Sequence, residues 1–432
     1  MRLAYWTFLS LMCIWSWTPS LRAEIVCAGQ TNFVTTTNLT AGTNLAGRTL
    51  LAAYYPHRFR KGGLISHVTA NIASLDPGTN GLYFLVARPN GVNWDLVSQS
   101  GYVTPVVGTN TYTLATPMPC RDGDALGCWL SPGALALVAS AVPGNILYRN
   151  GELNGTNLSA KILVENRGLD LFAALAAPEV AFTGDSIMSG FNLGSYWYPF
   201  MDINGGTYGT WSASIPHRVQ DLYLTNLNYM NYARRSSGFD WIVASALPNI
   251  INDGATTLWI HSGVNDANAG VTWSNILADL DLIRAAFPLP KRIYVAELLP
   301  NGLSDAVALT DRTWNANLAA WCQTNGATLV RFHDAFGVLR PSTEYLDDLA
   351  PEYASDGVHL SQAGVDLYAQ WVAAYLLHLE IAWSNSGSVV SWDRGVLQTA
   401  EELGGQWTDV PGAASPYAPI GLAVHRFYRL RN

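Results

Sequence analysis

Charged residues are scarce in this 432-residue chain, where Asp, Glu, Lys and Arg together make up 13%. Basic residues are scarcer than acidic ones, at 24 against 32, which gives a formal net charge of −8. A surface with this balance has little overall attraction for a polyanion. The composition therefore argues against nucleic acid or an anionic membrane surface as the main partner.

Cysteine is rare as well, with five residues in the chain. Their spacing does not match a zinc site, and we expect no metal. Cys120 and Cys128 are close enough in sequence to close a short disulfide loop in an oxidising compartment. Two unpaired, buried thiols are an equally good interpretation of the same pair.

The apolar run near the N-terminus, from Leu3 to Trp17, is too short to span a bilayer comfortably. A basic residue precedes it, and a polar break and the small residue Ala23 follow it, which is the pattern of a secretory signal peptide over residues 1–23. A buried terminal helix is the alternative. Cys27 lacks the preceding sequence of a lipid-anchor site. We therefore expect a secreted or periplasmic protein without membrane insertion.

Residues 24–176 contain short, partly alternating apolar runs separated by Gly, Pro, Asn and Asp. This pattern predicts a β-sandwich of the jelly-roll kind, and no helix of useful length is predicted within it. The expected strands are 64–72, 81–87, 95–99, 110–114, 124–130 and 134–138. The chain is thus expected to begin with an all-β domain.

Residues 177–383 alternate between apolar strand patterns and helical patterns. The expected strands are 180–183, 229–232, 257–261, 292–297 and 328–332, and the expected helices are 213–224, 241–249, 273–286, 310–324 and 361–378. Repeated strand–helix units predict an α/β domain of three layers, with a parallel sheet between helices. The loops that follow the strands then share one sheet edge, where ligands bind in such folds.

The last segment, residues 384–432, returns to β character. Strands are expected at 388–393, 395–399, 407–410 and 425–430. They predict a small C-terminal β module, which could pack against the α/β domain, bind sugar or serve export sorting.

The sequence Gly184-Asp185-Ser186 follows the predicted strand 180–183. An apolar strand that ends in this turn places the serine hydroxyl at the carboxyl edge of the sheet, because glycine permits the sharp reversal. The position suits a nucleophile, although Gly, Asp and Ser are also common turn formers. The catalytic interpretation therefore depends on partners elsewhere in the chain.

Two later loops carry residues that complement Ser186, namely Gly263-Val264-Asn265-Asp266 and Asp356-Gly357-Val358-His359. His359 has the side chain whose unperturbed pKa suits removal of the serine proton near neutral pH. Asp356 can reach the other imidazole nitrogen and fix its tautomer. Taken singly, these residues also fit plain turn and helix-start roles. Together they predict Ser186, Asp356 and His359 as the catalytic residues.

These three motifs resemble the blocks of the SGNH (GDSL-type) hydrolase family and occur in the family's order. They are the Gly-Asp-Ser of 184–186, the Gly-x-Asn-Asp of 263–266 and the Asp-x-x-His of 356–359, and the resemblance covers roughly residues 178–380. It implies a flavodoxin-like hydrolase domain that cleaves carboxylic esters through an acyl-serine intermediate. It implies no metal or organic cofactor.

The oxyanion of such a reaction needs hydrogen-bond donors. The predicted donors are the side-chain amide of Asn265 and backbone N–H groups near Ser186. The second family block departs from the usual Asn-x-x-x-x-Gly, because Asn231 is followed by Ser236 at the glycine's place. Ser236 can still donate its N–H if its backbone dihedral angles permit, or a shifted loop can offer Gly238.

The long connection from residue 191 to 213 is rich in aromatic residues interleaved with glycine. Beside a nucleophile they could stack on sugar rings or hold an acyl or aryl group, and they could equally pack the insertion. Arg234 and Arg235 could contact an acidic sugar or be solvated. His261 is favoured as a supporting residue over a base. The candidate substrate-binding residues are Trp197, Tyr198, Trp211, Arg234 and His261.

The predicted function is that of a secreted ester hydrolase that removes O-acetyl groups from a polysaccharide or oligosaccharide. A sandwich followed by such a domain resembles the arrangement in some carbohydrate acetylesterases, and the low charge is typical of extracellular carbohydrate-active proteins. Its expected partner is an acylated carbohydrate or small ester. A lipid or aryl esterase with the same catalytic residues is the first alternative, and a non-catalytic carbohydrate-binding protein is the second.

Overall fold

The structure is a computed structural model of the full chain, and its description is confined to part of the sequence. The described residues are 24–29, 37–38, 48–52, 58–59, 62–75, 81–90, 93–130, 135–140, 145–150, 158–159, 161–165, 168–169, 171–191, 193, 197–201, 207–211, 213–224, 226–377, 379–384, 387–392, 396–400, 408–415, 417 and 427–431. The predicted signal peptide, residues 1–23, lies outside them. Within the described chain, no helix has the length and apolar character needed to cross a membrane.

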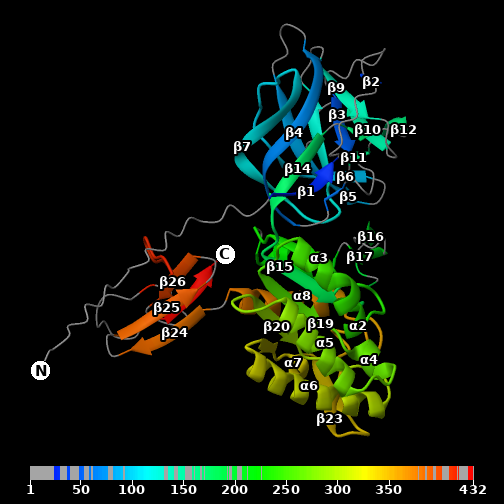
Figure 1. The fold of residues 1–432 in the computed structure, drawn as a ribbon, viewed down its shortest axis with the longest axis vertical. Coiled ribbons are helices and arrows are strands. Elements are labelled where there is room, and N and C mark those ends of the chain that lie inside the picture. Colours follow the sequence, from blue (N-terminus) through cyan, green and yellow to red (C-terminus); the bar gives the residue numbers. More distant parts are fainter. Residues whose placement is uncertain are drawn as a thin grey trace, which may run out of the picture.

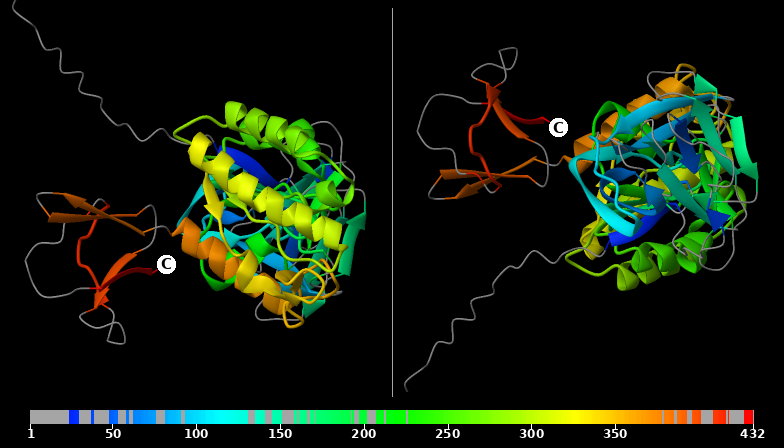
Figure 2. Two further views of the ribbon diagram at one scale, coloured as in Figure 1. Left: turned by 90° about the horizontal axis from the view of Figure 1, so that it is seen from below. Right: turned by 90° about the horizontal axis from the view of Figure 1, so that it is seen from above.

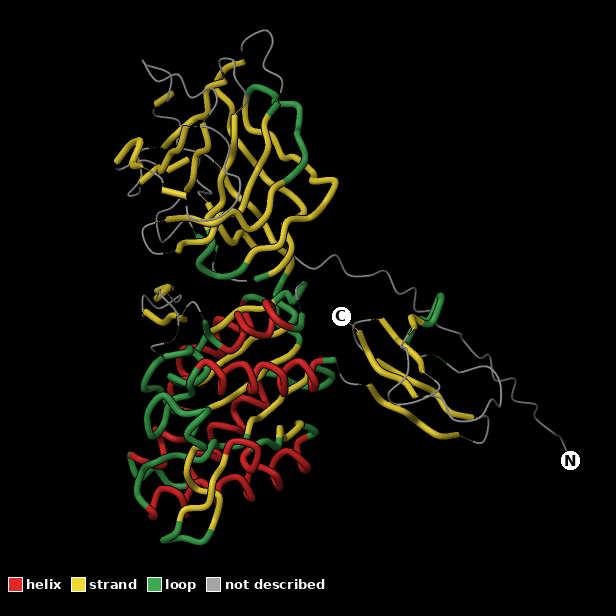
Figure 3. The backbone as a smooth tube through the Cα atoms, turned by 180° about the vertical axis from the view of Figure 1, so that it is seen from behind, coloured by secondary structure: helices red, strands yellow, loops and turns green. Residues whose placement is uncertain are grey.

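Three units follow one another along the chain (Figure 1). The first consists of strands, the second of strands and helices, and the third is a small set of strands at the C-terminus, as the colouring of Figure 3 shows. Figure 2 shows the third unit beside the other two in both views. This order matches the predicted sequence of sandwich, α/β domain and β module.

The first unit is a β-sandwich, and its described residues form fourteen strands in two antiparallel sheets. The strands are β1 (Glu24–Gly29), β2 (Thr37–Asn38), β3 (Arg48–Ala52), β4 (Gly63–Leu75), β5 (Leu82–Asn90), β6 (Asn93–Gln99), β7 (Gly108–Cys120), β8 (Ala125–Leu130), β9 (Leu135–Ser140), β10 (Asn145–Asn150), β11 (Leu158–Ser159), β12 (Lys161–Glu165), β13 (Gly168–Leu169) and β14 (Leu171–Ala176). One sheet has the order β1-β14-β4-β9-β13, with β2 beside β9 and β7 beside β4, and the other has the order β11-β6-β5-β8-β3-β10-β12. The predicted all-β first domain is confirmed.

The two sheets enclose an apolar core between them. Ile65 and Val68 of β4 face Phe84 of β5 in this core, and each is fully buried. Cys120 and Cys128 are both buried and are not joined by a disulfide, and burial raises the pKa of Cys128 to about 12. Of the two interpretations of this pair, the structure favours buried core thiols.

The second unit is the α/β domain. Its elements are β15 (Val180–Gly184), β16 (Trp197–Met201), β17 (Thr207–Trp211), α1 (Ile215–Leu222), β18 (Tyr229–Asn231), α2 (Phe239–Trp241), the π-helix η2 (Ile242–Ala246), α3 (Leu247–Asn252), β19 (Thr257–His261), α4 (Val264–Asn268), α5 (Trp273–Ala286), β20 (Arg292–Ala296), α6 (Asp305–Asn325), β21 (Thr328–Val330), α7 (His333–Phe336), β22 (Gly337–Arg340), β23 (Tyr345–Leu349) and α8 (Gln362–Leu376). The parallel sheet has the order β18-β15-β19-β20-β21, which is the flavodoxin-like order. The predicted three-layer α/β fold is confirmed.

Helices cover both faces of this sheet with apolar side chains. On one face, α1 and α8 pack over Phe182 and Trp259, and on the other, α3, α5 and α6 pack over Leu258 and Ile260. The strands alternate between the two layers, so β15 and β19 are buried along almost their whole length. Burial on both faces leaves the loops at the carboxyl ends of the strands as the site for chemistry.

The third unit contains β24 (Leu379–Ser384), β25 (Gly387–Trp392), β26 (Val396–Ala400), β27 (Thr408–Asp409) and β28 (Phe427–Arg431). β24 pairs with β25, and β26 lies between β27 and β28. β24 was not among the predicted strands, and it crosses the boundary that the sequence placed between residues 383 and 384.

The sandwich joins the α/β domain at the amino end of β18. Gly62 and Tyr229 exchange two backbone hydrogen bonds, with N···O distances of 3.0 and 3.2 Å. Gly62 thereby pairs with the outer strand of the parallel sheet, β18. Because Tyr229 is the first residue of β18, this contact lies at the amino ends of the strands, whereas the Gly-Asp-Ser turn lies at their carboxyl ends.

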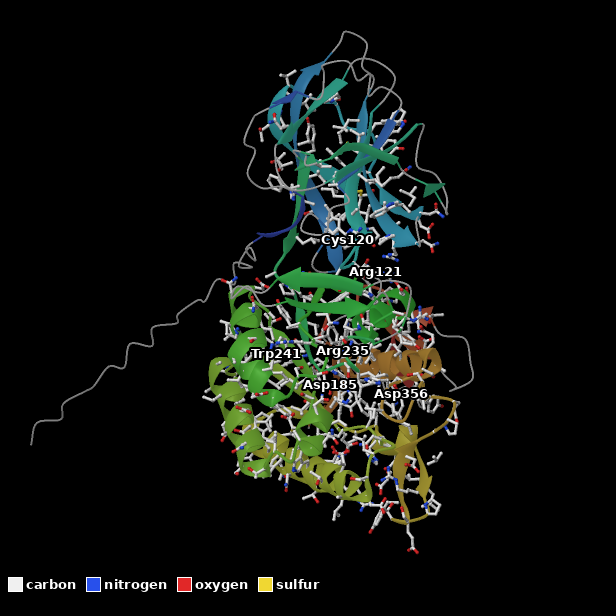
Figure 4. The ribbon with its side chains drawn as sticks, turned by 90° about the vertical axis from the view of Figure 1, so that its right-hand side faces the viewer. Cys120, Arg121, Asp185, Arg235, Trp241 and Asp356 are labelled. Atoms are coloured by element: carbon white, nitrogen blue, oxygen red, sulfur yellow. The ribbon has the colours of Figure 1, made fainter. Side chains whose placement is uncertain are left out.

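A buried polar cluster reinforces the same junction. Asp122, from the turn between β7 and β8, accepts the Tyr229 hydroxyl hydrogen at 2.7 Å and pairs with His217 of α1. Arg121 reaches Asp221 at the end of α1, at 2.5 Å. Figure 4 shows Arg121 at the end of the sandwich nearest the α/β domain. The two domains therefore share a buried interface rather than a bare linker.

Candidate active site

The site begins with the turn that ends β15. Gly184 has a φ of +149°, and a side chain there would run into the carbonyl oxygen of His261 on the neighbouring strand. The turn is closed by the N–H of Ser189, which donates to Asp185 O at 3.1 Å. Ser186 lies in this turn and is 6% exposed to solvent. Glycine is thus required here by the close approach of β19.

Ser186, His359 and Asp356 form a continuous hydrogen-bonded chain. The Nε2 atom of His359 lies 3.0 Å from Ser186 Oγ, and its Nδ1 atom lies 2.8 Å from Asp356 Oδ2. Ser186 and His359 are 173 residues apart in sequence, and the fold brings them together at one sheet edge. This is the geometry in which an imidazole removes a serine proton while a carboxylate holds its tautomer.

Asp356 is held by its own loop in an ionised form. Burial alone would raise its pKa, but the backbone N–H and side chain of His359 and the N–H of Val358 outweigh burial and lower the pKa below its usual value. The two N–H groups reach Asp356 Oδ1 at 2.7 and 2.8 Å. The spacing Asp-x-x-His therefore fixes both the charge of the carboxylate and its aim at the imidazole.

The candidate oxyanion donors lie around the nucleophile. Ser236 has a φ of +59°, so it adopts the left-handed conformation that glycine favours, as the family's second block would need. Asn265 donates one amide hydrogen to Ser237 O at 3.0 Å and retains a second. In the described part of the chain, the backbone N–H groups of Ser186, Ser236 and Gly238 have no acceptor. These groups remain the predicted donors.

Gly238 is fixed by a different contact. A side chain at this position would collide with the carboxylate of Asp266, which accepts the Phe239 N–H at 3.3 Å. Burial raises the pKa of Asp266 to about 6. The Gly-x-Asn-Asp motif thus fastens the Ser236–Gly238 loop twice, through the amide of Asn265 and the carboxyl of Asp266.

Asp185, beside the nucleophile, is fully buried. Burial raises its pKa to about 7, although the N–H of Ile187 donates to Oδ1 at 2.9 Å and partly offsets this. The carboxyl lacks a cationic partner among the described residues. A folded-state pKa above 3.8 means that the folded protein binds this proton more tightly than the unfolded chain does. Its ionisation therefore costs stability as the pH rises from about 4 to about 7.

We expect Asp185→Asn to become more stable relative to the wild type as the pH rises through that window. The amide keeps the Oδ1 acceptor but has no proton to lose. Melting temperatures measured from pH 4 to pH 8 test this, with Asp334→Asn, whose side chain is 86% exposed, as the matched change. A difference for Asp185→Asn that stays constant with pH would contradict the assignment.

His261 supports the site from beneath and does not line it. It is 2% exposed, and burial lowers its pKa to about 3, so the imidazole is neutral. Its ring packs against Tyr368 of α8 and Phe332, with centroid distances of 5.3 and 6.2 Å. This burial favours the supporting role that the sequence predicted over direct contact with a substrate, and the assignment of His261 to substrate binding stays a prediction.

Phe191 is a site residue that the sequence did not single out. The centroid of its ring lies 4.7 Å from the ring centroid of His359. The guanidinium carbon of Arg235 lies 4.5 Å from the same Phe191 centroid. Arg234 lies 5.8 Å from the Trp241 ring. The only sequence signal was the position of Phe191 five residues after the nucleophile, which is too weak to predict a contact with a histidine 168 residues later.

The aromatic connection forms a hairpin. β16 and β17 pair antiparallel, with Trp197 opposite Trp211 and Tyr198 opposite Thr210. The side chains of these residues lie outside the described part of the structure. Trp197, Tyr198 and Trp211 therefore stay predictions as substrate contacts.

A cavity of about 580 Å³ lies elsewhere in the domain, beyond the carboxyl ends of β20 and β21. Its lining includes Arg312, His333, Tyr345 and Trp371 but none of the predicted catalytic residues. We place the active site at Ser186 and not at this cavity, because the hydrogen bonds that join Ser186, His359 and Asp356 define the chemistry. Among the described residues, no group of three or more His, Cys, Asp or Glu side chains is arranged to hold a metal ion.

This fold and site define a three-layer α/β domain of the serine-hydrolase type, with a serine, a histidine and an aspartate at one edge of the sheet. Residues 182–367, which lie within the α/β domain, match the GDSL-like lipase/acylhydrolase family. The resemblance drawn from the three motifs is confirmed. A comparison with curated proteins gave no match.

The solved structures that match this chain cover somewhat less than half of it. A GDSL-like lipase from Bacteroides thetaiotaomicron is 20% identical, with a TM-score of 0.34, over 46% of this chain and 89% of that chain. An acetylxylan esterase from Geobacillus stearothermophilus, solved as a catalytic mutant, is 18% identical, with a TM-score of 0.34, over 45% and 91%. A lipase/acylhydrolase from Enterococcus faecalis is 15% identical, with a TM-score of 0.33, over 46% and 95%.

Proposed function

We propose that this protein is a secreted esterase that removes O-acetyl groups from a polysaccharide or oligosaccharide. The single observation that carries the esterase assignment is a pair of hydrogen bonds made by His359. Its Nε2 atom lies 3.0 Å from Ser186 Oγ, and its Nδ1 atom lies 2.8 Å from Asp356 Oδ2. The N-terminal pattern of residues 1–23 supports secretion. The sandwich and C-terminal β module, together with the low charged content, favour a carbohydrate substrate.

In the first half of the reaction, His359 Nε2 removes the Ser186 proton as Oγ attacks the carbonyl carbon of the ester. The carbonyl oxygen takes the negative charge, which Asn265 and the nearby N–H groups stabilise. The intermediate collapses when the bond to the sugar oxygen breaks. His359 then gives its proton to that oxygen, which leaves as a free hydroxyl and leaves the acyl group on Ser186.

In the second half, water replaces the sugar. His359 removes a proton from the water as its oxygen attacks the acyl carbon, and the same donors stabilise the second oxyanion. Collapse breaks the bond to Ser186 Oγ, which regains a proton from His359. Acetic acid is released and the starting enzyme is restored, so no co-reactant other than water is consumed.

The test is release of acetate from a panel of acetylated plant and algal polysaccharides, measured beside hydrolysis of p-nitrophenyl acetate and of medium-chain p-nitrophenyl esters. We expect acetate release from at least one polysaccharide and weak activity on the longer chains. Strong preference for medium-chain esters without acetate release would favour a lipid or aryl esterase. Binding to polysaccharide with no turnover of any ester would show a non-catalytic carbohydrate-binding protein.

A further inference from the structure

Two neighbouring arginines stand at the rim of the candidate site. Arg234 and Arg235 are both exposed and follow β18 directly. The N–H of Arg234 donates to the carbonyl oxygen of Gly184 at 2.9 Å, which ties this segment to the turn that carries Ser186. Figure 4 shows Arg235 in the same part of the domain as Asp185 and Asp356. The backbone of this segment is therefore fastened to the turn that carries the nucleophile.

Aromatic contacts orient both side chains without neutralising them. Arg235 lies over Phe191, which in turn contacts His359, and Arg234 lies over Trp241. A ring face attracts a guanidinium and leaves its N–H groups free at the edge to bind an anion. The stack from Arg235 through Phe191 therefore places a cation one ring away from the catalytic imidazole.

Within the described chain, neither Arg234 nor Arg235 has a carboxylate partner, whereas other arginines do. Asp240, the acid nearest in sequence, accepts the Trp241 N–H at 2.7 Å through its own side chain. Arginines that pair with Asp or Glu elsewhere are Arg88, Arg121, Arg218, Arg312, Arg331 and Arg340. In a chain of net charge −8, two uncompensated cations at the reactive edge form a local exception.

We propose that Arg234 and Arg235 bind a carboxylate of the substrate, so that the preferred substrate is an acetylated polysaccharide built from uronic acid units. The inference rests on the proposed function and adds the charge of the substrate to it. The planar fork of arginine matches a carboxylate with two parallel hydrogen bonds. The acidic remainder of the protein repels a polyuronate elsewhere, which directs productive binding to the rim of the site.

The experiment compares one acetylated polyuronate in two forms, with its carboxyl groups free and with the same groups converted to neutral amides. The measured quantity is the ratio of kcat/KM for acetate release from the two forms. We expect the wild type to prefer the acidic form and to lose this preference as salt is added, because exposed charges are screened. We expect the double variant Arg234→Gln, Arg235→Gln to lower the ratio roughly 10-fold or more.

Two single variants sharpen the result. Arg235→Lys keeps the charge but not the fork, so its ratio should lie between those of the wild type and the double variant. Arg331→Gln removes an arginine that is 68% exposed near β21 and should leave the ratio at the wild-type value. A fall in the ratio for Arg331→Gln equal to that of the double variant would mean that net charge, rather than these two residues, sets the preference.

The experiment distinguishes failure of the arginine proposal from failure of the acetylesterase proposal. Equal acetate release from both forms by the wild type, or an unchanged ratio in the double variant, would overturn the role of the arginines while the acetylesterase assignment survives. Absence of acetate release from either form and from neutral polysaccharides, with p-nitrophenyl acetate still hydrolysed, would overturn both proposals and leave only the esterase chemistry.

Discussion

Ser186→Ala and His359→Ala should each lower ester turnover by roughly 10³-fold or more, while the protein stays folded. Alanine at position 186 removes the atom that would bond the acyl group, and alanine at position 359 removes the base that lies 3.0 Å from it. The two residues act as one unit, so the double variant should lose little more than either single variant. Steady-state hydrolysis of p-nitrophenyl acetate measures all three.

The controls are chemically matched residues away from the site. Ser342→Ala removes an exposed hydroxyl that bonds Asp305, and His333→Ala removes an imidazole near the cavity beyond β21. Both should hydrolyse the small ester at close to the wild-type rate. Circular dichroism and melting temperature show whether the site variants are folded. Near-normal turnover in folded Ser186→Ala or His359→Ala would reject the catalytic assignment.

Asn265→Ala should lower kcat by about 10²- to 10³-fold with little change in KM. The reason is that its free amide hydrogen matters chiefly when negative charge develops on the carbonyl oxygen. The structure adds a second contribution, since the other hydrogen holds Ser237 O at 3.0 Å and so steadies the loop of Ser236. Both effects act on the oxyanion, and neither changes binding of the neutral ester.

A matched variant separates this effect from general loss of stability. Asn315 also uses its amide to fasten backbone, with Nδ2 3.1 Å from Leu298 O and Oδ1 2.8 Å from Leu298 N, but it lies on α6 away from Ser186. Asn315→Ala should lower the melting temperature and leave kcat near its normal value. A rise in KM alone for Asn265→Ala would make Asn265 a residue that binds substrate rather than one that stabilises the oxyanion.

The strands and helices that the sequence predicted well are those with strong apolar patterns. β15 and β19 are short and buried on both faces, so their continuous apolar runs mark them as strands of a parallel sheet. α5 was predicted with the bounds that the structure shows, Trp273–Ala286. The first two motif loops follow β15 and β19 directly, and the third lies just before α8, so the predicted element order placed Ser186, Asn265 and His359 at one edge.

The hairpin of β22 and β23 escaped prediction because its inward residues are polar. Arg340 and Asp347 are buried in it, and Arg340 pairs with Asp348 and Asp305. A strand whose buried residues include an arginine and an aspartate lacks a clear apolar alternation, so periodicity cannot reveal it.

The conformation of Ser236 was equally hidden. Its positive φ follows from contacts of its neighbour Ser237, whose hydroxyl lies 3.0 Å from Gly184 O and whose carbonyl accepts from Asn265. These two partners come from separate parts of the chain, and no local sequence pattern predicts the contacts. Phe191 was missed as a site residue for the same reason, since its contacts with His359 and Arg235 are set by the fold and not by sequence spacing.

The measurement that tests the account most directly is the intact mass of the protein after reaction with a fluorophosphonate. In this reaction, an activated serine oxygen bonds to phosphorus as fluoride leaves, so the gain in mass reports the nucleophile itself. We expect one adduct on the wild type, located on Ser186 by peptide mapping, and none on Ser186→Ala under the same conditions. An adduct of equal yield on Ser186→Ala, or a wild type that hydrolyses esters yet forms no adduct on Ser186, would contradict the acyl-serine mechanism.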